Sequence, residues 1–146
     1  MKLRSTYLAG PTATVVAALL VGCGQSKPER AAVVAVEGAV SFQGHPLPGA
    51  MVVLHPKSGV RADVPTPRAL VDKDGTFRVS TYDAGDGAPP GEYVATIAWY
   101  KLVGQRGDVQ AGPNVLPPKY SNPKTSPWVI RVAEQSTRLP PVQLRR

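Results

Sequence analysis

Cysteine, histidine and aromatic residues are scarce in this chain of 146 residues. Its single cysteine, Cys23, cannot form an intrachain disulfide, so the folded part must depend on a hydrophobic core. The two histidines, His45 and His55, form no cluster with Cys23 at metal-ligand spacing, and we expect both to be structural or exposed. A Gly-x-Ser-x-Gly turn and a phosphate-binding loop are also missing. We therefore expect no catalytic residues and no cofactor.

Long helical patterns are missing as well. Sixteen prolines and fourteen glycines interrupt the sequence, and no apolar stretch after Cys23 keeps a helical period over several turns. The first two dozen residues have the character of a targeting segment, which leaves enough chain for one domain. This pattern predicts a single all-β domain.

Basic residues are in modest excess but do not cluster. The net charge of +7 falls to +5 (15 basic minus 10 acidic) when Lys2 and Arg4 are removed with the targeting segment. The remaining basic residues are scattered from Lys27 to Arg146. Because nucleic-acid binding requires them on one face, we expect no nucleic-acid partner. Scattered charge can still attract anionic lipid or acidic polysaccharide.

The N-terminal segment has the order of an export signal. Two basic residues precede the uncharged residues 5–22, which contain the apolar stretch Ala13–Val21. Residues 20–23, Leu-Val-Gly-Cys, resemble the lipobox of bacterial lipoproteins. The resemblance implies a signal peptide at 1–22, cleavage before Cys23, and a diacylglyceryl group on the Cys23 sulfur, with acyl chains such as palmitate. The chain is then exported and anchored to a cell-envelope membrane, facing the periplasm or the exterior.

Two alternatives explain the N-terminus less well. A transmembrane anchor needs about twenty apolar residues, and Gly10-Pro11 shortens this stretch to roughly half of that. An ordinary secretory signal would leave Cys23 as an exposed free thiol in an oxidising compartment. We expect residues 23–30, which are polar after the cysteine, to be a lipid-anchored tether, and residues 31–146 to be the folded domain.

Seven short segments have the pattern of β-strands between turns. They are residues 33–42, 50–55, 68–71, 76–81, 91–100, 128–132 and 139–144. We expect the first two to form a hairpin and the 91–100 strand to be central. Residues 101–127 are too long and proline-rich for one strand, and an irregular segment of this length favours a functional role. The pattern predicts an antiparallel sandwich of about seven strands.

Three segments resemble carboxypeptidase regulatory-like, or transthyretin-like, domains: residues 36–50, 71–77 and 89–93. Residues 118–127 are similar to a segment of small planctomycete-type lipoproteins that carry this domain. The resemblance implies an Ig-like (prealbumin-like) β-sandwich but no established activity. Some transthyretin relatives are 5-hydroxyisourate hydrolases with a histidine-rich site and a Tyr-Arg-Gly-Ser tail. This chain ends Gln-Leu-Arg-Arg and has two histidines, so that enzymatic role is the least favoured.

Two groups of residues are candidates for binding. Aromatic, hydroxyl and amide side chains gather near residues 117–128 and could hold a sugar or a peptide: Tyr120, Ser121, Asn122, Ser126 and Trp128. The alternative is that its two aromatic residues fix a long loop to the core. Four aspartates are weak candidates for calcium, although the pattern of a calcium loop is incomplete and an ordinary turn explains it better: Asp72, Asp74, Asp83 and Asp86. We expect no metal.

These observations favour a non-catalytic, membrane-anchored module that binds envelope protein or polysaccharide. The alternative is a protein that binds a small ligand or carbohydrate through the Tyr120–Trp128 loop.

Overall fold

The computed structural model describes residues 29–105 and 107–146. The predicted signal peptide, Cys23 and most of the predicted tether lie outside the described residues. Within the described part, no helix has the length and apolar character needed to cross a membrane. The described chain is all-β, with one short 3-10 helix, as the sequence predicts.

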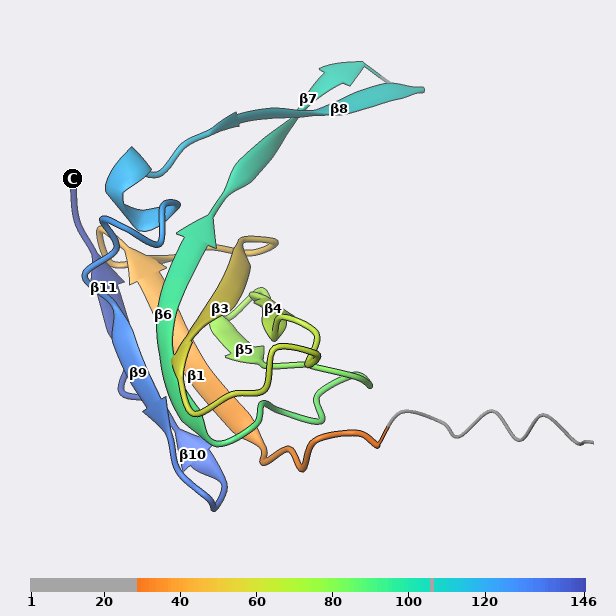
Figure 1. The fold of residues 1–146 in the computed structure, drawn as a ribbon. Helices are drawn as coiled ribbons and strands as arrows, with labels where there is room; N and C mark the ends of the chain where they lie inside the picture. The colour runs from red at the N-terminus through yellow and green to blue at the C-terminus, as the bar shows by residue number, and fades with distance from the viewer. Residues whose placement is uncertain (1–28, 106) are drawn as a thin grey trace, which may run out of the picture.

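Eleven strands make up the described part (Figure 1). The strands of the first half are β1 (Val36–Phe42), β2 (His45–Pro46), β3 (Met51–Ser58), β4 (Arg68–Leu70), β5 (Thr76–Arg78) and β6 (Gly91–Ala98). The second half contains β7 (Tyr100–Gln105), β8 (Asp108–Asn114), the 3-10 helix η1 (Pro118–Tyr120), β9 (Val129–Val132), β10 (Thr137–Arg138) and β11 (Val142–Leu144). Each of the seven predicted strands overlaps one of these.

The strands form two larger sheets and one separate hairpin. The first sheet has β1 at its centre, with β2 and β5 along one edge and β10 and β11 along the other. The second sheet has the antiparallel order β4-β3-β6-β9, so β6 is internal, as predicted. β7 and β8 form a two-stranded sheet of their own.

One hydrophobic core joins the two larger sheets. Val36 and Val40 of β1, Phe77 of β5, and Leu54 and Tyr93 of the second sheet are all buried in it. Side chains at alternate positions along a strand point to the same face of the sheet, so apolar residues at these positions all face the core. Burial of each large side chain contributes roughly 1.5–3 kcal/mol, which supports the domain without a disulfide among the described residues.

The predicted hairpin between the first two strands is wrong. The turn at Gln43 and Gly44, both with positive φ, instead folds β2 back onto β1. The chain then crosses to the other sheet, where β3 pairs with β4 and β6. Leu47 is fully buried in this crossing segment, so its burial in the core favours the crossing over a hairpin.

The predicted antiparallel pairing is confirmed for the other strand pairs but is wrong for β10 and β11. β10 and β11 both lie parallel to β1. They follow β9, which belongs to the second sheet, and therefore reach β1 through a crossing between sheets. A tight hairpin joins only antiparallel neighbours, whereas a crossing allows either direction.

Candidate functional site

The predicted ligand-binding loop, residues 117–128, is attached to the body through Tyr120. This residue lies in η1 and is only 8% exposed. Its hydroxyl donates a hydrogen bond to the Arg145 carbonyl oxygen at 2.9 Å and accepts one from the Arg145 amide at 3.1 Å. The Lys119 ammonium lies 5.0 Å from the ring centroid. Tyr120 therefore joins the loop to the C-terminal segment.

Trp128 and Ser126 hold the far end of the same loop. The Trp128 ring is half-buried and meets Phe77 edge to face, with 6.2 Å between centroids and 80° between planes. The Ser126 hydroxyl donates to the Ala95 carbonyl oxygen on β6 at 2.6 Å and accepts from the Trp128 amide at 3.3 Å. These contacts extend the pairing along β6 beyond the end of β9.

Ser121 and Asn122 remain at the surface. The Ser121 hydroxyl donates to the Pro118 carbonyl oxygen, and the Asn122 side-chain oxygen accepts from the Lys124 amide. The structure thus places Ser121 and Asn122 outward, while Tyr120 and Trp128 pack inward on the body. The aromatic residues do not form a joint exposed platform, so the geometry fits the structural alternative better than a sugar site.

The four candidate aspartates lie in two separate loops. Asp72 and Asp74 belong to the turn between β4 and β5. Asp74 accepts hydrogen bonds from the hydroxyl and the amide of Thr76, at 2.7 and 2.9 Å, and both lower the pKa of its carboxyl. This is the bonding of an ordinary Asx turn.

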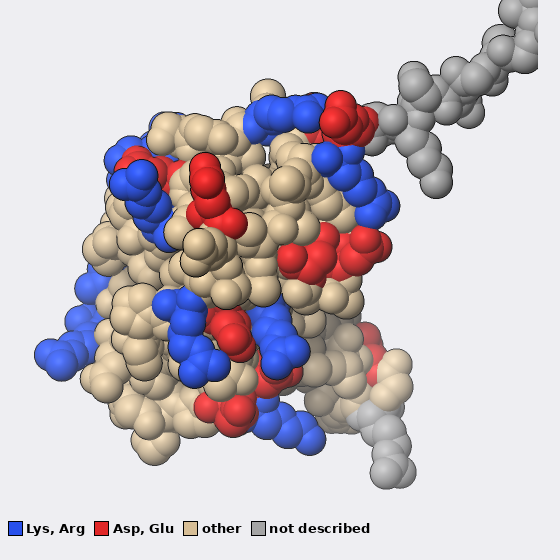
Figure 2. All heavy atoms as spheres, turned by 90° about the horizontal axis from the view of Figure 1, so that it is seen from below, with Lys and Arg blue, Asp and Glu red and all other residues tan. Residues whose placement is uncertain are grey.

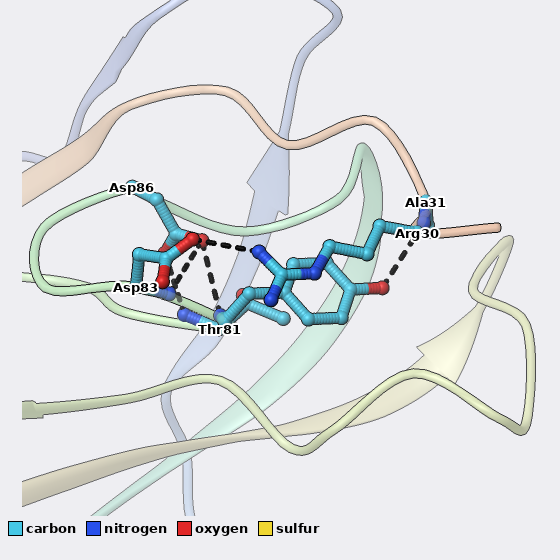
Figure 3. Close-up of polar contacts among 6 residues, drawn as sticks. Arg30, Ala31, Thr81, Asp83 and Asp86 are labelled. Atoms are coloured by element: carbon cyan, nitrogen blue, oxygen red, sulfur yellow. Dashed lines mark hydrogen bonds and ion pairs between the residues drawn. The ribbon is translucent and has the colours of Figure 1, made fainter. Parts of the chain in front are cut away.

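Asp86 organises the second loop (Figure 3). Its carboxylate accepts from the backbone amides of Thr81, Tyr82 and Asp83 at 2.7–3.0 Å. Partial burial opposes ionisation of Asp86, but these backbone donors outweigh it and lower its pKa. In the described part of the chain, no group of three or more acidic, histidine or cysteine side chains is placed to hold a metal ion.

Asp83 takes part in a contact that the sequence did not reveal, which we call the latch: Arg30 and Ala31 against Tyr82 and Asp83. Arg30 pairs with the Asp83 carboxylate at 2.7 Å and lies 5.1 Å from the Tyr82 ring centroid. The Ala31 amide donates to the Tyr82 hydroxyl at 3.0 Å (Figure 3). The latch thus holds the first described residues against the loop between β5 and β6.

An open groove of about 890 Å³ lies at one end of the second sheet. Its walls include Ser58 from β3, Glu92 from β6 and Arg131 from β9. Gly91 allows the close approach, because a Cβ there would lie 2.9 Å from the Ser58 carbonyl oxygen. The lining mixes charged residues with apolar ones such as Val132 and Ala133, and it contains no aromatic residue, so it lacks a stacking surface for a sugar ring.

Charged residues of both signs lie side by side on the face seen in Figure 2. Lys57 and Glu92 are 3.8 Å apart, and Arg78 and Arg138 both lie near Glu37. Basic side chains alternate with acidic ones on this face rather than forming a single basic stripe.

The hairpin β7–β8 projects from the body as an arm (Figure 1). It occupies residues 100–114, and all but the first of these lie in the stretch 101–127 that the sequence predicts to be irregular. Leu102 pairs with Ala111 and Gly104 with Val109, so these residues share one face. Leu102 is 75% exposed and Val109 is 57% exposed. The arm thus carries an uncovered apolar face.

The base of the arm is firmly bonded. The Asn114 side-chain oxygen accepts from the Trp99 amide at 2.9 Å and from the Leu116 amide at 3.2 Å. The Trp99 indole N–H donates to the Pro48 carbonyl oxygen at 3.0 Å. These bonds tie both ends of the hairpin to the body.

Comparison with known proteins adds little. No family model matches the chain, and no curated protein matches it. Among solved structures, a Pseudomonas aeruginosa protein provisionally described as carbohydrate-binding is 12% identical, with a TM-score of 0.44, over 81% of this chain and 91% of its own. A 9R-lipoxygenase from Cyanothece is 13% identical, with a TM-score of 0.37, over 83% of this chain and 18% of its own. Likenesses this weak carry no argument about function.

Proposed function

We propose that this protein is an exported, lipid-anchored and non-catalytic module of the bacterial cell envelope that binds another protein through the β7–β8 arm. The observation that carries the binding role is the exposure of apolar side chains on that arm. Soluble proteins rarely leave a contiguous apolar surface uncovered unless it has a partner.

The anchor rests on the Leu-Val-Gly-Cys sequence that ends at Cys23, and the latch is compatible with it. Seven residues separate the predicted lipid from the latched Arg30, if Cys23 itself is included. A chain of this length spans at most about 25 Å when fully extended. The body of the protein would therefore be kept close to the membrane surface.

The arm lies at the opposite end of β6 from the latched N-terminus. Val34 pairs with Ala88, three residues before β6 begins, whereas the arm follows directly after β6 ends (Figure 1). The eight residues of β6 extend over about 26 Å. An arm in this position points away from the anchored end, which favours a protein partner over the anchoring membrane.

The chemistry of the arm also argues against insertion into lipid. Its turn is bordered by Gln105 and Asp108, which are polar and exposed, and the apolar residues lie along the two strands. A two-stranded sheet also has two open edges with unpaired backbone groups, and these are costly in hydrocarbon. Both features suit a protein surface.

The lipid anchor is tested by mass spectrometry of the mature chain purified from membranes. We expect the N-terminal peptide to begin at Cys23 and to carry acyl chains, and Cys23→Ser to leave the chain unprocessed. A mature chain that retains residues 1–22 with an unmodified cysteine would contradict the proposal.

The binding role is tested with a photo-reactive amino acid placed at Leu102 of the full chain in cells. We expect cross-links to protein, and the same probe at the exposed Asn122 serves as the matched control. Cross-links to lipid alone, or equal cross-linking at both positions, would contradict binding through the arm. A glycan array with the wild type and the Tyr120→Ala and Trp128→Ala variants tests the carbohydrate alternative in parallel.

A further inference from the structure

A second cavity lies where β4 meets the chain of β5, which is the corner at which the two larger sheets join (Figure 1). Its volume is about 510 Å³, and no described residue of β7 or β8 lines it. A cavity of this size accommodates a small molecule. The side chains that the lining contributes are Met51, Arg68, Leu70, Asp72, Arg78 and Ser80.

The strand register places most of these side chains on one surface. Backbone hydrogen bonds of 3.0 and 2.8 Å join Arg68 to Ser80, and this antiparallel register puts Leu70 beside Arg78. The residues that lie between them on each strand are buried in the core. Because successive side chains point to opposite faces, these four side chains point outward. Met51 of β3 pairs with Leu70 and extends the same row.

Two arginines therefore face one cavity from neighbouring strands. Within residues 29–105 and 107–146, Arg68 has no acidic side chain within 4.0 Å. Arg78 reaches Glu37 through Nε at 4.0 Å, and Glu37 also pairs with Arg138 at 3.4 Å. A guanidinium has five N–H donors, so both arginines retain donors for a ligand. Like charges on adjacent strands repel, and an anion bound between them relieves the repulsion.

Ser80 adds a hydroxyl group beside Arg68. Its oxygen accepts a hydrogen bond from the Gly85 amide at 2.8 Å, and its proton remains to be donated. A carboxylate has two oxygens that accept several hydrogen bonds, and it pairs with arginine in a bidentate geometry. The end of the cavity at Arg68, Arg78 and Ser80 therefore suits a carboxylate.

The rest of the cavity is apolar and then acidic. Leu70 is 61% exposed and Met51 is 38% exposed, so the two side chains form an apolar wall in water. Asp72 lies two residues beyond Leu70, on the side away from Arg68. A ligand that matches this order carries a carboxylate, then an apolar group, and an N–H donor. An apolar amino acid with a free carboxylate has these three groups.

We propose that this cavity, which we call the carboxylate pocket, binds an apolar amino-acid residue through its free α-carboxylate. The carboxylate lies between Arg68 and Arg78. The side chain packs on Leu70 and Met51, and the N–H group donates to Asp72. The last residue of a peptide and a free amino acid share this chemistry. The inference goes beyond the proposed function, because the pocket is separate from the arm.

The test uses the full lipidated chain in mild detergent and the dipeptide alanyl-leucine. Exposed ion pairs contribute little, so the affinity is low and ligand-observed NMR is the suitable measurement of Kd. Alanyl-leucinamide lacks the carboxylate and alanyl-glycine lacks the apolar side chain. We expect each to bind at least about fivefold more weakly than alanyl-leucine. Absence of alanyl-leucine binding, or the same Kd for all three, would overturn the carboxylate pocket.

Arginine variants locate the binding. Arg68→Gln and Arg78→Gln should each weaken alanyl-leucine binding about fivefold, which is what an exposed ion pair of good geometry contributes. Arg131→Gln is the matched control, because it makes the same change on β9, at the opposite edge of the second sheet. Its Kd should equal that of the wild type, and thermal unfolding should show that all three variants fold. Equal weakening in all three would show attraction by net charge alone and would overturn the pocket.

The apolar wall is tested with Leu70→Asn, which keeps both arginines. We expect alanyl-leucine to lose its advantage over alanyl-glycine, while alanyl-leucinamide remains the weakest ligand. Inorganic phosphate that competes as well as alanyl-leucine would indicate a general anion site and would overturn the proposal. Free leucine and N-acetyl-alanyl-leucine distinguish the two sources of the ligand. Stronger binding of the acetylated peptide supports a peptide C-terminus, and stronger binding of leucine supports a free amino acid.

Discussion

The arm and the loop that follows it are neighbours in sequence, yet they place their apolar side chains in opposite ways. The arm, residues 100–114, leaves Leu102 and Val109 in water. The loop, residues 117–128, packs Tyr120 and Trp128 onto the body. Both fall almost wholly within the stretch that the sequence predicts to be irregular.

The comparison shows that residue type alone is a poor guide to which part of a long irregular segment is exposed. Tyr and Trp suggested a binding rim, but the Tyr120 hydroxyl already has two backbone partners at Arg145. The aliphatic arm suggested nothing, because glycines interrupt its pattern. Gly104 is required there, since it has a φ of 131° and a Cβ would lie 2.0 Å from the Asp108 carbonyl oxygen.

The largest expected difference between the two regions is in the free energy of unfolding when a tyrosine of each is replaced by alanine. Tyr120→Ala removes a buried ring, so it should lower the free energy of unfolding by about 4 kcal/mol. Tyr100→Ala in the arm removes a half-exposed ring and should change it by less than about 0.5 kcal/mol. Urea unfolding at low protein concentration measures both. If Tyr120→Ala kept full stability but lost binding to a glycan, the loop would be a ligand site after all.

A smaller effect is expected at the base of the arm. Asn114→Ala leaves the amides of Trp99 and Leu116 without their acceptor, which should cost about 2 kcal/mol. Hydrogen exchange of the arm amides should accelerate as well. Asn122→Ala in the loop removes one exposed bond and is the control, with an expected change below about 0.5 kcal/mol. Equal losses in both variants would contradict a specific anchor for the arm.

The smallest expected effect concerns β6, which supports both regions. The Tyr93 hydroxyl donates to the Pro89 carbonyl oxygen at 2.7 Å, so Tyr93→Phe should cost about 1 kcal/mol. Burial raises the pKa of Tyr93 to about 12, from the ordinary 10. The folded state therefore holds this proton more tightly, and the contribution is complete below pH 10 and lost as the pH rises through 12.

Unfolding measured between pH 9 and 12 checks this pH dependence. We expect the Tyr93→Phe variant to lose less stability than the wild type over that range, because the other titrating groups are unchanged. Parallel pH profiles for the two proteins would show that Tyr93 makes no such contribution.

Much of the fold could be predicted because strand alternation is a local property. Phe77 and Val79 alternate with polar residues, and Tyr93 alternates in the same way with Ala95 and Ile97. All five side chains are buried. Pairing was predicted less well, because it depends on which distant strand is available. The sequence gives no local sign that Leu47 directs the chain to the other sheet, or that β10 reaches β1 by a crossing.

For the candidate site, the sequence indicated which residue types are present but not which of them lie together or point outward. The inward direction of Tyr120 depends on the position of Arg145, which is 25 residues away. The latch joins residues 51 and 53 positions apart, and the groove is built from the ends of three strands. Glycine interruptions hid the arm, although Gln105 to Asp108 around Gly107 has the length of a tight hairpin turn.

The sequence by itself determined the all-β class and the approximate positions of seven strands, because each of these follows from the spacing of apolar residues along a few positions. It also carries the export and lipidation pattern around Cys23, which stays a prediction. Only the tertiary structure decided the strand pairing, the inward packing of the Tyr120–Trp128 loop and the exposure of the arm. The physical reason is that burial depends on contacts between distant segments, so an apolar side chain in the sequence indicates the core only where the fold supplies something to cover it.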